Sequence, residues 1–553
     1  MTTSRRTFLR TLAVGSALTA SYSRASVSTG NSRFDCSADV VVVGLGAAGA
    51  AAAITAADNG AEVIIVERQP LQTLRSNTRM SGGYIHCPDK DGDQKALKNY
   101  FLALFSAAYN NLPSVGEEDA ISEKMAQYWT QITPTLVDWL KSQDPDLKML
   151  ITGGGAQYVN FPGAKDCSYA VYRASYKDVI DNKTTTYKRQ KSEATEGEAL
   201  HRALLNGLSL RQDKITILDG TRALELITDA QKRVVGIVVD RAGKSVRIGA
   251  TKGVALCCGG YEYGAAMRKA FFGGLAIAGW AFYGTPFNEG DGIRMGLHVG
   301  ASLTKASACA ARMIWAPPVK VRGMRIGVTT NGIGSPSTIV VNSLGERFVN
   351  ENLIMGGITN NCFYEKACEQ SLKTLTYDNL PSWLVMDDRV FRTRPLANVT
   401  RSTVGYGFVE FKNNADALQK GWVLKAETIE ELAEKIAATG GNAARMQPEV
   451  LKNTVKEFNA ACTAGVDARF GRARSSLRPI RKGPFYAIPL FAGGSNTKGG
   501  LTTDADRRVL DWNGRPIEGL YAAGEIACGL NRGGAMLTDA LVFGIVCGKT
   551  MTA

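Results

Sequence analysis

Residues Asp39 to Glu67 read DVVVVGLGAAGAAAAITAADNGAEVIIVE, and this stretch decides the fold of the chain. A run of valines leads into Gly44-x-Gly46-x-x-Gly49, which is followed by alanines. The first glycine permits a sharp turn, the second lets backbone approach a pyrophosphate, and the third lets a helix pack closely on a strand. Such a helix directs its N-terminal N–H groups at the phosphates. The spacing therefore predicts a βαβ unit that binds a dinucleotide.

Glu67 indicates which dinucleotide fits this unit. It follows a second apolar run, residues 63–66, so its carboxylate is placed to accept hydrogen bonds from ribose hydroxyls, whereas a 2′-phosphate would be repelled. This favours FAD or NAD over NADP. The alternative is a glycine-rich turn in an ordinary α/β protein, and the strand, helix and acid at the expected distances argue against it.

The first 25 residues have the pattern of a twin-arginine export signal. Arg5-Arg6 precedes a mildly apolar run at 11–20 and a small-x-small cleavage pattern, Ser23-Arg24-Ala25. The apolar run is about ten residues long, too short for a transmembrane helix, and no later stretch reaches spanning length. A disordered basic start is the alternative. We expect a periplasmic protein that folds around its cofactor before export.

Composition limits the class of protein and of partner. A chain of 553 residues with 45% hydrophobic content can bury a large core, which suggests two domains. The formal charge is +14, and four of the arginines lie in residues 1–25. Nucleic acid is not an expected partner outside the cytoplasm. The basic balance is compatible with an anionic substrate, an acidic redox partner, a membrane surface or a simply solvated surface.

Cysteine and histidine usage argues against a metal centre. The eleven cysteines form no CxxC or CxxCH motif, so the signatures of haem attachment, a clustered iron–sulfur site and a zinc ribbon are missing. Only three histidines occur. We therefore expect no metal site, and proton transfer by a tyrosine, arginine, lysine or carboxylate.

Periodicity and turn residues give a coarse secondary structure. Residues 74–88 are expected to be a loop and 150–190 an irregular surface. Helices are expected at 95–142, 198–208, 291–300, 428–438 and 447–463, and from Gly533 through 546, and strands at 215–218, 223–227, 234–240, 337–341 and 519–522. No internal repeat is visible.

Six ordered signatures resemble the FAD-dependent fumarate reductase and 3-ketosteroid dehydrogenase superfamily. They are GLGAAG…E at 44–67, SGG at 81–83, ALCCGGYE at 255–262, NEGDGI at 288–293, IVVNSLGERFVNE at 339–351 and GLYAAGE…NRGG at 519–534. The resemblance implies an α/β fold, with a doubly wound Rossmann-like FAD domain built from both chain ends and an inserted α+β cap domain. The expected divisions are 1–25 for the signal, 38–295 and 483–553 for the FAD domain, and 296–482 for the cap.

The resemblance also implies the residues that hold FAD. Glu525 would contact the ribityl chain, Asp291 would face the cofactor, and the helix starting near Gly533 would point its positive end at the flavin N1/C2=O edge. A plain turn or helix-cap role is the alternative for both acids. The full set assigned to the cofactor comprises Gly44, Gly46, Ala47, Ala48, Gly49, Glu67, Arg68, Ser81, Gly82, Gly83, Gly260, Asp291, Glu525, Gly534, Ala535 and Leu537.

The positions that would identify a substrate depart from both named specificities. Fumarate reductases of this family place a proton-donating arginine four residues after the glutamate of RFVNE, and ketosteroid dehydrogenases place a tyrosine there; this chain has Met355. The carboxylate-binding His-Thr-x-Gly-Gly begins here with Asn496. A second carboxylate-binding arginine is retained as Arg532. Short dicarboxylates are therefore not the expected substrates.

A flavin that exchanges hydride through N5 needs an acid or base at the other carbon and a group that polarises the carbonyl. The candidates are Arg532, Tyr486, Lys498, Tyr84 and Asn496. Arg532 can hold a carboxylate or enolate oxygen through two hydrogen bonds. For either tyrosine, a buried ring with a hydrogen-bonded hydroxyl is the alternative.

The sequence thus predicts an exported FAD-dependent oxidoreductase that reduces or forms a C=C bond conjugated to a carbonyl, in an enone such as a 3-oxosteroid-like compound or in an enoate. Without a haem or iron–sulfur motif in the chain, a separate carrier such as a quinone or a cytochrome would exchange its electrons. Other hypotheses are a flavin oxidase or hydroxylase on the same scaffold, a fumarate reductase-like dicarboxylate reductase, and a non-catalytic flavin electron-transfer subunit.

Overall fold

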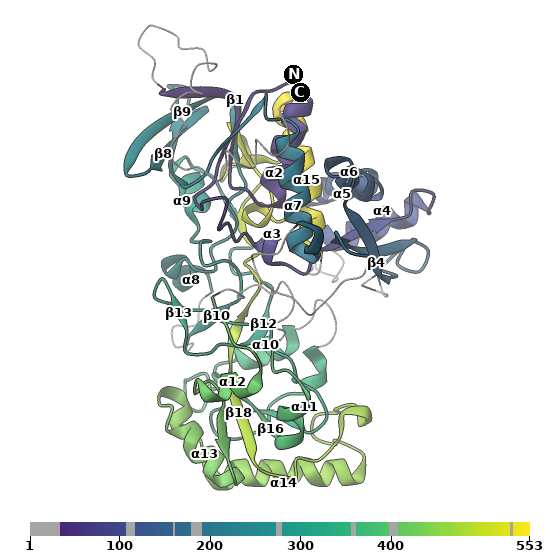
Figure 1. Ribbon diagram of the computed structural model, residues 1–553, viewed down its shortest axis with the longest axis vertical. Coiled ribbons are helices and arrows are strands. Elements are labelled where there is room, and N and C mark those ends of the chain that lie inside the picture. The colour runs from purple at the N-terminus through teal and green to yellow at the C-terminus, as the bar shows by residue number, and fades with distance from the viewer. Residues whose placement is uncertain are drawn as a thin grey trace.

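The computed structural model describes residues 34–106, 117–156, 158, 161–178, 191–272, 279–354, 361–397, 408–530 and 535–553 (Figure 1). An upper lobe holds both described chain ends, and a lower lobe is built from the middle of the chain (Figure 1). The leader at 1–25, Met355 and Arg532 lie outside the described residues. No helix within the described ranges is long and apolar enough to cross a membrane.

An eight-stranded sheet forms the centre of the upper lobe. Its main path runs β20-β21-β9-β1-β2-β6, with β7 and β8 attached through β9. The strands are β1 (Cys36–Val43), β2 (Val63–Val66), β6 (Ile215–Leu218), β7 (Thr221–Thr228), β8 (Val234–Arg241), β9 (Lys244–Leu256), β20 (Arg508–Leu510) and β21 (Pro516–Ala522). β1 lies parallel to both β2 and β9, and β9 is also parallel to β21. This is the predicted doubly wound arrangement, with β21 supplied by the C-terminal part of the chain.

Small residues let three helices pack on this sheet. They are α2 (Ala47–Asp58), α7 (Glu196–Ser209) and α15 (Met536–Thr552), which lie side by side in Figure 1. A Cβ added to Gly544 would lie 2.5 Å from the carbonyl oxygen of Ala48, and one added to Gly548 would lie 2.5 Å from that of Ala52. The alanine-rich α2 therefore touches α15 backbone to backbone, which fixes the N-terminus of each helix at the same edge of the sheet.

A satellite of helices and a small sheet flanks these helices. The helices expected at 95–142 are confirmed as α4 (Gln94–Phe105), α5 (Glu117–Ile132) and α6 (Leu136–Gln143). Two expectations were wrong: 74–88 holds the short helix α3 (Asn77–Met80) and β3 (Tyr84–Pro88), and 150–190 overlaps β4 (Lys148–Gly154) and holds β5 (Tyr169–Ser175). The strands form an antiparallel sheet in the order β3-β5-β4. β3 pairs with β5, which lies far away in the sequence, so the turn-forming residues nearby led to the prediction of a loop.

A second, six-stranded sheet organises the lower lobe. It contains β10 (Trp280–Phe282), β12 (Arg312–Trp315), β15 (Thr338–Val341), β16 (Ser382–Asp387), β17 (Leu424–Ala426) and β18 (Phe485–Gly494). β18 pairs with β10, β12, β16 and β17. The predicted boundaries at 295 and 482 would assign β10 and β18 to the FAD domain, whereas both strands pair within this second sheet. The chain enters this lobe at β10, returns to the upper lobe for residues 291–303, and finally leaves the lower lobe after β18.

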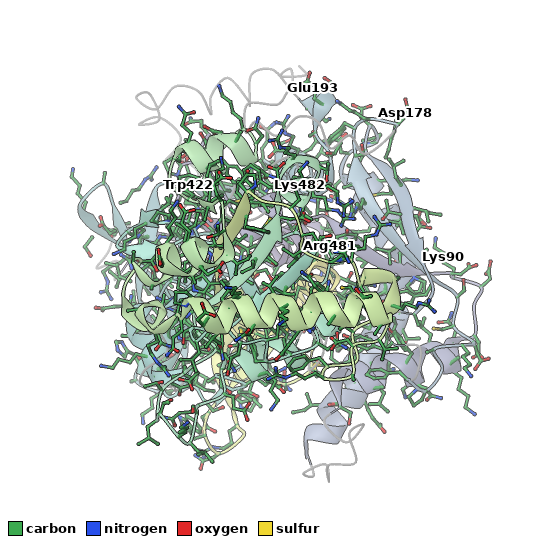
Figure 2. All side chains as sticks on the ribbon, turned by 90° about the horizontal axis from the view of Figure 1, so that it is seen from below. Lys90, Asp178, Glu193, Trp422, Arg481 and Lys482 are labelled. Atoms are coloured by element: carbon green, nitrogen blue, oxygen red, sulfur yellow. The ribbon has the colours of Figure 1, made fainter. Side chains whose placement is uncertain are left out.

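Helices cover the far end of the lower lobe. α13 (Ile429–Ala437) and α14 (Pro448–Ala464) confirm the two predicted there. The short helices α11 (Asp388–Thr393) and α12 (Asn414–Gln419) also belong to this lobe, and α10 (Asn361–Ala367) lies at its end nearer the upper lobe (Figure 1). In the view from below, α14 crosses the far end of the lower lobe. Arg481 and Lys482, which precede β18, lie at this end of the lobe too (Figure 2). α8 (Ala265–Phe271), α9 (Asp291–His298) and the strand pair β11 (Leu303–Thr304) with β19 (Gly500–Leu501) pack against the core of the upper lobe, and the pair β13 (Lys320–Val321) with β14 (Met324–Arg325) packs against that of the lower lobe.

Candidate active site

A cavity of about 720 Å³ extends from the upper sheet to the lower lobe. Twelve of the residues assigned to the cofactor from sequence line it, namely Gly44, Gly46, Ala47, Ala48, Glu67, Arg68, Ser81, Gly82, Gly83, Asp291, Glu525 and Leu537. On the other side the wall includes Cys309, Arg312, Thr329 and Tyr364, which precede or belong to elements of the lower lobe. One continuous space thus adjoins both lobes.

The three glycines of the glycine loop, residues 44–49, have different surroundings. Gly44 has a φ of +102°, and an added Cβ would lie 2.6 Å from the carbonyl oxygen of Cys257. Gly49 does not line the cavity; its Cβ would overlap the carbonyl oxygen of Gly44, so this glycine serves helix packing. At Gly46 an added Cβ would meet only the Thr78 hydroxyl, at 3.5 Å. The second glycine therefore leaves open space at the start of α2.

The first turn of α2 suits a pyrophosphate. The N–H of Ala47 donates to Thr78 Oγ1 over 2.9 Å, while the next N–H groups have no partner within their own helix, as in any first turn. Because the helix N-terminus carries a partial positive charge and faces the open space at Gly46, an anionic group is favoured there. The geometry fits the dinucleotide that the spacing predicts.

Glu67 is tied to the glycine loop. Its Oε2 accepts the N–H of Leu45 over 2.9 Å and its Oε1 accepts that of Gln69 over 2.8 Å. Burial raises the pKa of this carboxyl, and the two backbone N–H groups oppose the rise. Each oxygen keeps a further acceptor direction toward the cavity, so a ribose hydroxyl can be bound there.

An ion-pair cluster closes the cavity beyond Glu67. Asp291, at the start of α9, accepts hydrogen bonds from Arg222 over 2.8 Å to each oxygen, and Arg68 lies 3.4 Å from its Oδ2. Burial alone would raise the pKa of Asp291, but the hydrogen bonds and charge of Arg222 and the charge of Arg68 lower it. Arg68 also pairs with Glu289 at 3.0 Å. Arg68 and Asp291, each assigned to the cofactor from sequence, thus meet here in one network.

Glu525 also lines the cavity. Both its oxygens accept hydrogen bonds from Asn77 Nδ2 over 3.0 Å, and Oε2 accepts one from Asn288 over 3.2 Å. Burial and the neighbouring charge of Glu262 raise its pKa to about 8. Sequence reasoning missed Asn77, Asn288 and Glu262. Asn77 lay in a stretch interpreted as a loop, although Ser76 before it is an N-cap residue whose side chain accepts from Arg79.

Three of the catalytic candidates meet in the cavity. Lys498 and Asn496 line it on the segment before β19, and Tyr84 lines it at the start of β3. Burial lowers the pKa of Lys498, as do the charges of Lys305 and Arg312. The Asn496 amide donates to Thr497 O over 2.7 Å, and its oxygen accepts from Ser495 Oγ over 2.6 Å. These two polar residues therefore contribute a cation and a fixed amide to one wall.

Tyr486 is not part of the site. It lies in β18 at the centre of the lower sheet, stacks on Phe391 with ring centroids 3.8 Å apart, and donates to Asp388 over 3.1 Å. It does not line the cavity. The sequence placed it near Asn496 because both belong to one segment, but an extended strand carries residues ten positions apart far from each other. We therefore withdraw Tyr486 as a proton donor.

The remaining predicted residues divide into two groups. Gly260 and Ala535 are described but do not line the cavity; a Cβ at Gly260 would overlap Thr497 Oγ1, which indicates a packing role. Arg532 and Gly534 lie outside the described residues, so their assignments stay predictions. Tyr364 on α10 was missed. Its hydroxyl lies 3.7 Å from Cys309 Sγ, and burial holds its pKa well above the usual value, so it is a neutral phenol at the cavity wall.

Comparison with known proteins shows the family. The family model for the FAD binding domain matches residues 39–537. The chain belongs to this family. It is therefore a flavoprotein, and the predicted FAD cofactor and α/β fold are confirmed.

Relatives with known names are dehydrogenases and reductases. The chain is 27% identical to an NADH:acrylate oxidoreductase of Vibrio harveyi, over 93% of this chain and 50% of that protein. It is 27% identical to a 3-oxosteroid 1-dehydrogenase of Mycolicibacterium smegmatis, over 88% and 92%. With a 4-oxocyclohexanecarboxylate 2-dehydrogenase of Sinomonas cyclohexanicum it shares 26% identity, over 93% and 92%. The chain thus spans half the length of the first relative and nearly all of the others, and it is an FAD-dependent oxidoreductase of their family.

Solved structures support the fold. A 3-ketosteroid Δ1-dehydrogenase from Sterolibacterium denitrificans superimposes with a TM-score of 0.72 at 23% identity, over 93% of this chain and 99% of that one. An open form of a flavocytochrome c3 fumarate reductase gives a TM-score of 0.61 at 21% identity, over 93% of this chain and 78% of that one. At these identities the likeness concerns the fold alone.

Proposed function

We propose that the protein transfers hydride between the N5 position of FAD and a carbon of a C=C bond conjugated to a carbonyl. The observation that carries this proposal is the single cavity that adjoins the glycine loop on one side and Lys498, Arg312 and Tyr364 on the other. A substrate in the second part of that space would lie beside the cofactor. The named relatives, which act on an acrylate, an oxosteroid and an oxocyclohexane carboxylate, support the same class of substrate.

FAD supplies the hydride donor or acceptor, and the chain supplies the groups around the substrate. Lys498 and Arg312 place positive charge beside the carbonyl oxygen, which gains negative charge as hydride arrives at the β-carbon. The phenol of Tyr364 is a proton donor for the α-carbon, and its high pKa keeps it protonated. Arg532, predicted from sequence, is a second candidate for holding the carbonyl or carboxylate oxygen.

The proposed substrate is larger than a short dicarboxylate. Met355 replaces the proton donor of fumarate reductases and Asn496 replaces a carboxylate-binding histidine. Tyr283 and Tyr364 add aromatic surface to the cavity wall, which suits the ring of an enone or an aromatic enoate. Rapid fumarate turnover by the purified FAD-loaded enzyme would overturn this part of the proposal.

The direction of the reaction is tested by anaerobic titration. The oxidised holoprotein is mixed with saturated ketones and acids, and the dithionite-reduced holoprotein with the matching enones and enoates, while the flavin absorbance is followed. Bleaching in the first series assigns a dehydrogenase, and reoxidation in the second assigns a reductase. If neither occurs with any member of the panel, hydride transfer to conjugated C=C bonds is refuted.

We also propose export and a separate electron carrier. The twin-arginine pattern at 5–6 supports export, and the absence of a CxxCH motif from the sequence supports an external carrier such as a quinone or a cytochrome. Cell fractionation of the tagged chain, with Arg5 and Arg6 both changed to lysine as the control, tests export. Fast turnover with NADH as the sole reductant would contradict the separate carrier.

A further inference from the structure

Two buried carboxyl groups share the same pair of amides behind the cavity wall. Asn77 Nδ2 donates to both oxygens of Glu525 over 3.0 Å and lies 3.1 Å from Glu262 Oε1. Asn288 Nδ2 lies 2.8 Å from Glu262 Oε1 and 3.2 Å from Glu525 Oε2. Since each nitrogen bridges both acids, the two carboxyl groups lie close together. Glu525 lines the cavity, whereas Glu262 is completely buried and does not.

No cation within the described residues forms a salt bridge with either acid. The side chains that contact them are neutral, namely Asn77 of α3, Asn288 before α9, and Thr497, whose Oγ1 lies 3.3 Å from Glu262 Oε2. Arg268 of α8, Cys309, Tyr261 and Tyr263 lie near enough to Glu262 for its charge to affect their pKa values, but none of these four side chains forms a hydrogen bond with it. By contrast, the buried Glu198 pairs with Arg79 at 2.7 Å.

Two adjacent carboxylates cannot both be charged in such surroundings. Like charges repel strongly where the dielectric is low, so a pair of this kind retains one proton and titrates as a unit. Burial raises the pKa of both Glu262 and Glu525. Repulsion raises the pKa of whichever acid keeps the proton, and without a cofactor the charge of Glu262 acts on Glu525 in this way. Glu525 faces the cavity, where hydroxyl groups of the cofactor can donate to it, and Glu262 is completely buried, so with FAD bound the proton is best placed on Glu262.

We propose that Glu262 is a positioning residue that keeps a proton at neutral pH, so that Glu525 faces FAD as an ionised hydrogen-bond acceptor. A glutamine at 262 has the shape and the neutral charge of the protonated acid. Glu262→Gln should therefore reproduce the state that binds FAD, whereas Glu525→Gln removes the acceptor itself. The proposal concerns cofactor binding and is independent of which substrate the enzyme uses.

The pH dependence has a definite sign. Because the folded pair binds a proton that the unfolded chain releases above the ordinary glutamate pKa, the stability that the pair contributes falls as pH rises from about 4.5 toward about 8. FAD affinity of the wild type should fall in the same direction, because the second ionisation brings two negative charges together. Glu262→Gln removes this second ionisation and should flatten both curves.

The test measures FAD binding to the apoproteins by flavin fluorescence between pH 5.5 and 8.5. We expect wild-type affinity to fall about tenfold or more, and that of Glu262→Gln to change by less than about threefold. Glu525→Gln should bind FAD weakly throughout. The matched control is Glu198→Gln, a buried glutamate outside the cavity whose pKa is lowered by Arg79 and Arg202 against its burial, and which should follow the wild-type profile.

Infrared spectroscopy provides a readout that mere packing would not change. Wild-type protein at pH 7 should show C=O absorption from protonated carboxylic acids, to which the buried Asp539, with a pKa raised by burial to about 7, also contributes. Glu262→Gln should lose one component of this absorption, and Glu198→Gln should keep it. Parallel pH profiles for wild type and Glu262→Gln would overturn the proposal. So would the absence of a protonated-acid band in the wild type, a result that does not depend on any variant folding.

Discussion

Gly46→Ala should separate FAD binding from folding. The φ of Gly46 is −93°, which alanine adopts readily, and the added Cβ would meet only Thr78 Oγ1, at 3.5 Å. Replacing a glycine where its conformation suits alanine stabilises a protein by about 0.4–1 kcal/mol through the unfolded chain. The methyl group would nevertheless stand at the start of α2, beside the expected pyrophosphate. We predict unchanged or slightly raised apoprotein stability and an FAD affinity at least about tenfold lower, or about 1.4 kcal/mol.

Gly49→Ala is the matched control in the same loop. Its Cβ would overlap the carbonyl oxygen of Gly44 and lie 3.3 Å from Cys257 Cβ, so α2 would have to move away from β1. Overpacking of this kind costs about 1–3 kcal/mol. We expect a lower urea midpoint for the apoprotein, and FAD binding that weakens together with the fold.

The assay combines urea unfolding of the two apoproteins with FAD titration followed by fluorescence. The assignment of Gly46 to the pyrophosphate would be refuted if Gly46→Ala bound FAD with wild-type affinity. It would also be refuted if the Gly46→Ala apoprotein lost as much stability as that of Gly49→Ala. Unchanged stability in Gly49→Ala would refute the packing argument for the third glycine.

Three further substitutions test other parts of the site. Tyr486→Phe should lower the free energy of unfolding by about 0.5–1.5 kcal/mol through loss of its hydrogen bond to Asp388, and should leave turnover within about twofold of the wild type. Tyr364→Phe should instead lower turnover by about 100-fold or more with FAD affinity unchanged. Equal losses of turnover in the two variants would contradict this. Lys498→Met should lower kcat/KM for conjugated substrates by about tenfold or more while the flavin spectrum and FAD affinity stay as in the wild type, and a colourless protein would instead assign Lys498 to the cofactor. Burial lowers the pKa of His201 to about 3, so the unfolded chain binds a proton at this residue that the folded chain does not bind. Stability should therefore fall as pH drops from about 6.5 toward 3. If the urea midpoint of His201→Gln falls as steeply with decreasing pH as that of the wild type, this prediction is wrong.

Local spacing was sufficient to predict the dinucleotide unit. The three glycines and Glu67 lie within one βαβ unit, and each role depends on a neighbour fewer than thirty residues away or on backbone conformation. The spacing also gave Gly46 and Gly49 the separate roles that their surroundings fit, but it could not name the neighbours that make those surroundings. Those surroundings depend on where Thr78 and Cys257 lie.

Residues that act through distant partners were not predictable. Four separate segments bring together Asn77, Glu262, Asn288 and Glu525. No local sequence pattern predicts that these residues are in contact. The strand β18 falls on the FAD-domain side of the predicted boundary at 482 for a similar reason. Its sequence runs directly into the Asn496 motif, whereas its hydrogen-bond partners are β10, β12, β16 and β17.

The most direct test of the central claim is a single-turnover experiment with the FAD-loaded protein. In one arm the flavin is reduced anaerobically with one two-electron equivalent and mixed with an enone or an aromatic enoate. In the other arm the oxidised protein is mixed with the saturated counterpart. Flavin absorbance and product are measured together in both. We predict that at least one substrate changes the flavin by one two-electron equivalent per molecule of product, in one of the two directions. A flavin that reacts with dioxygen to give stoichiometric peroxide, but with no member of the panel, would contradict the account.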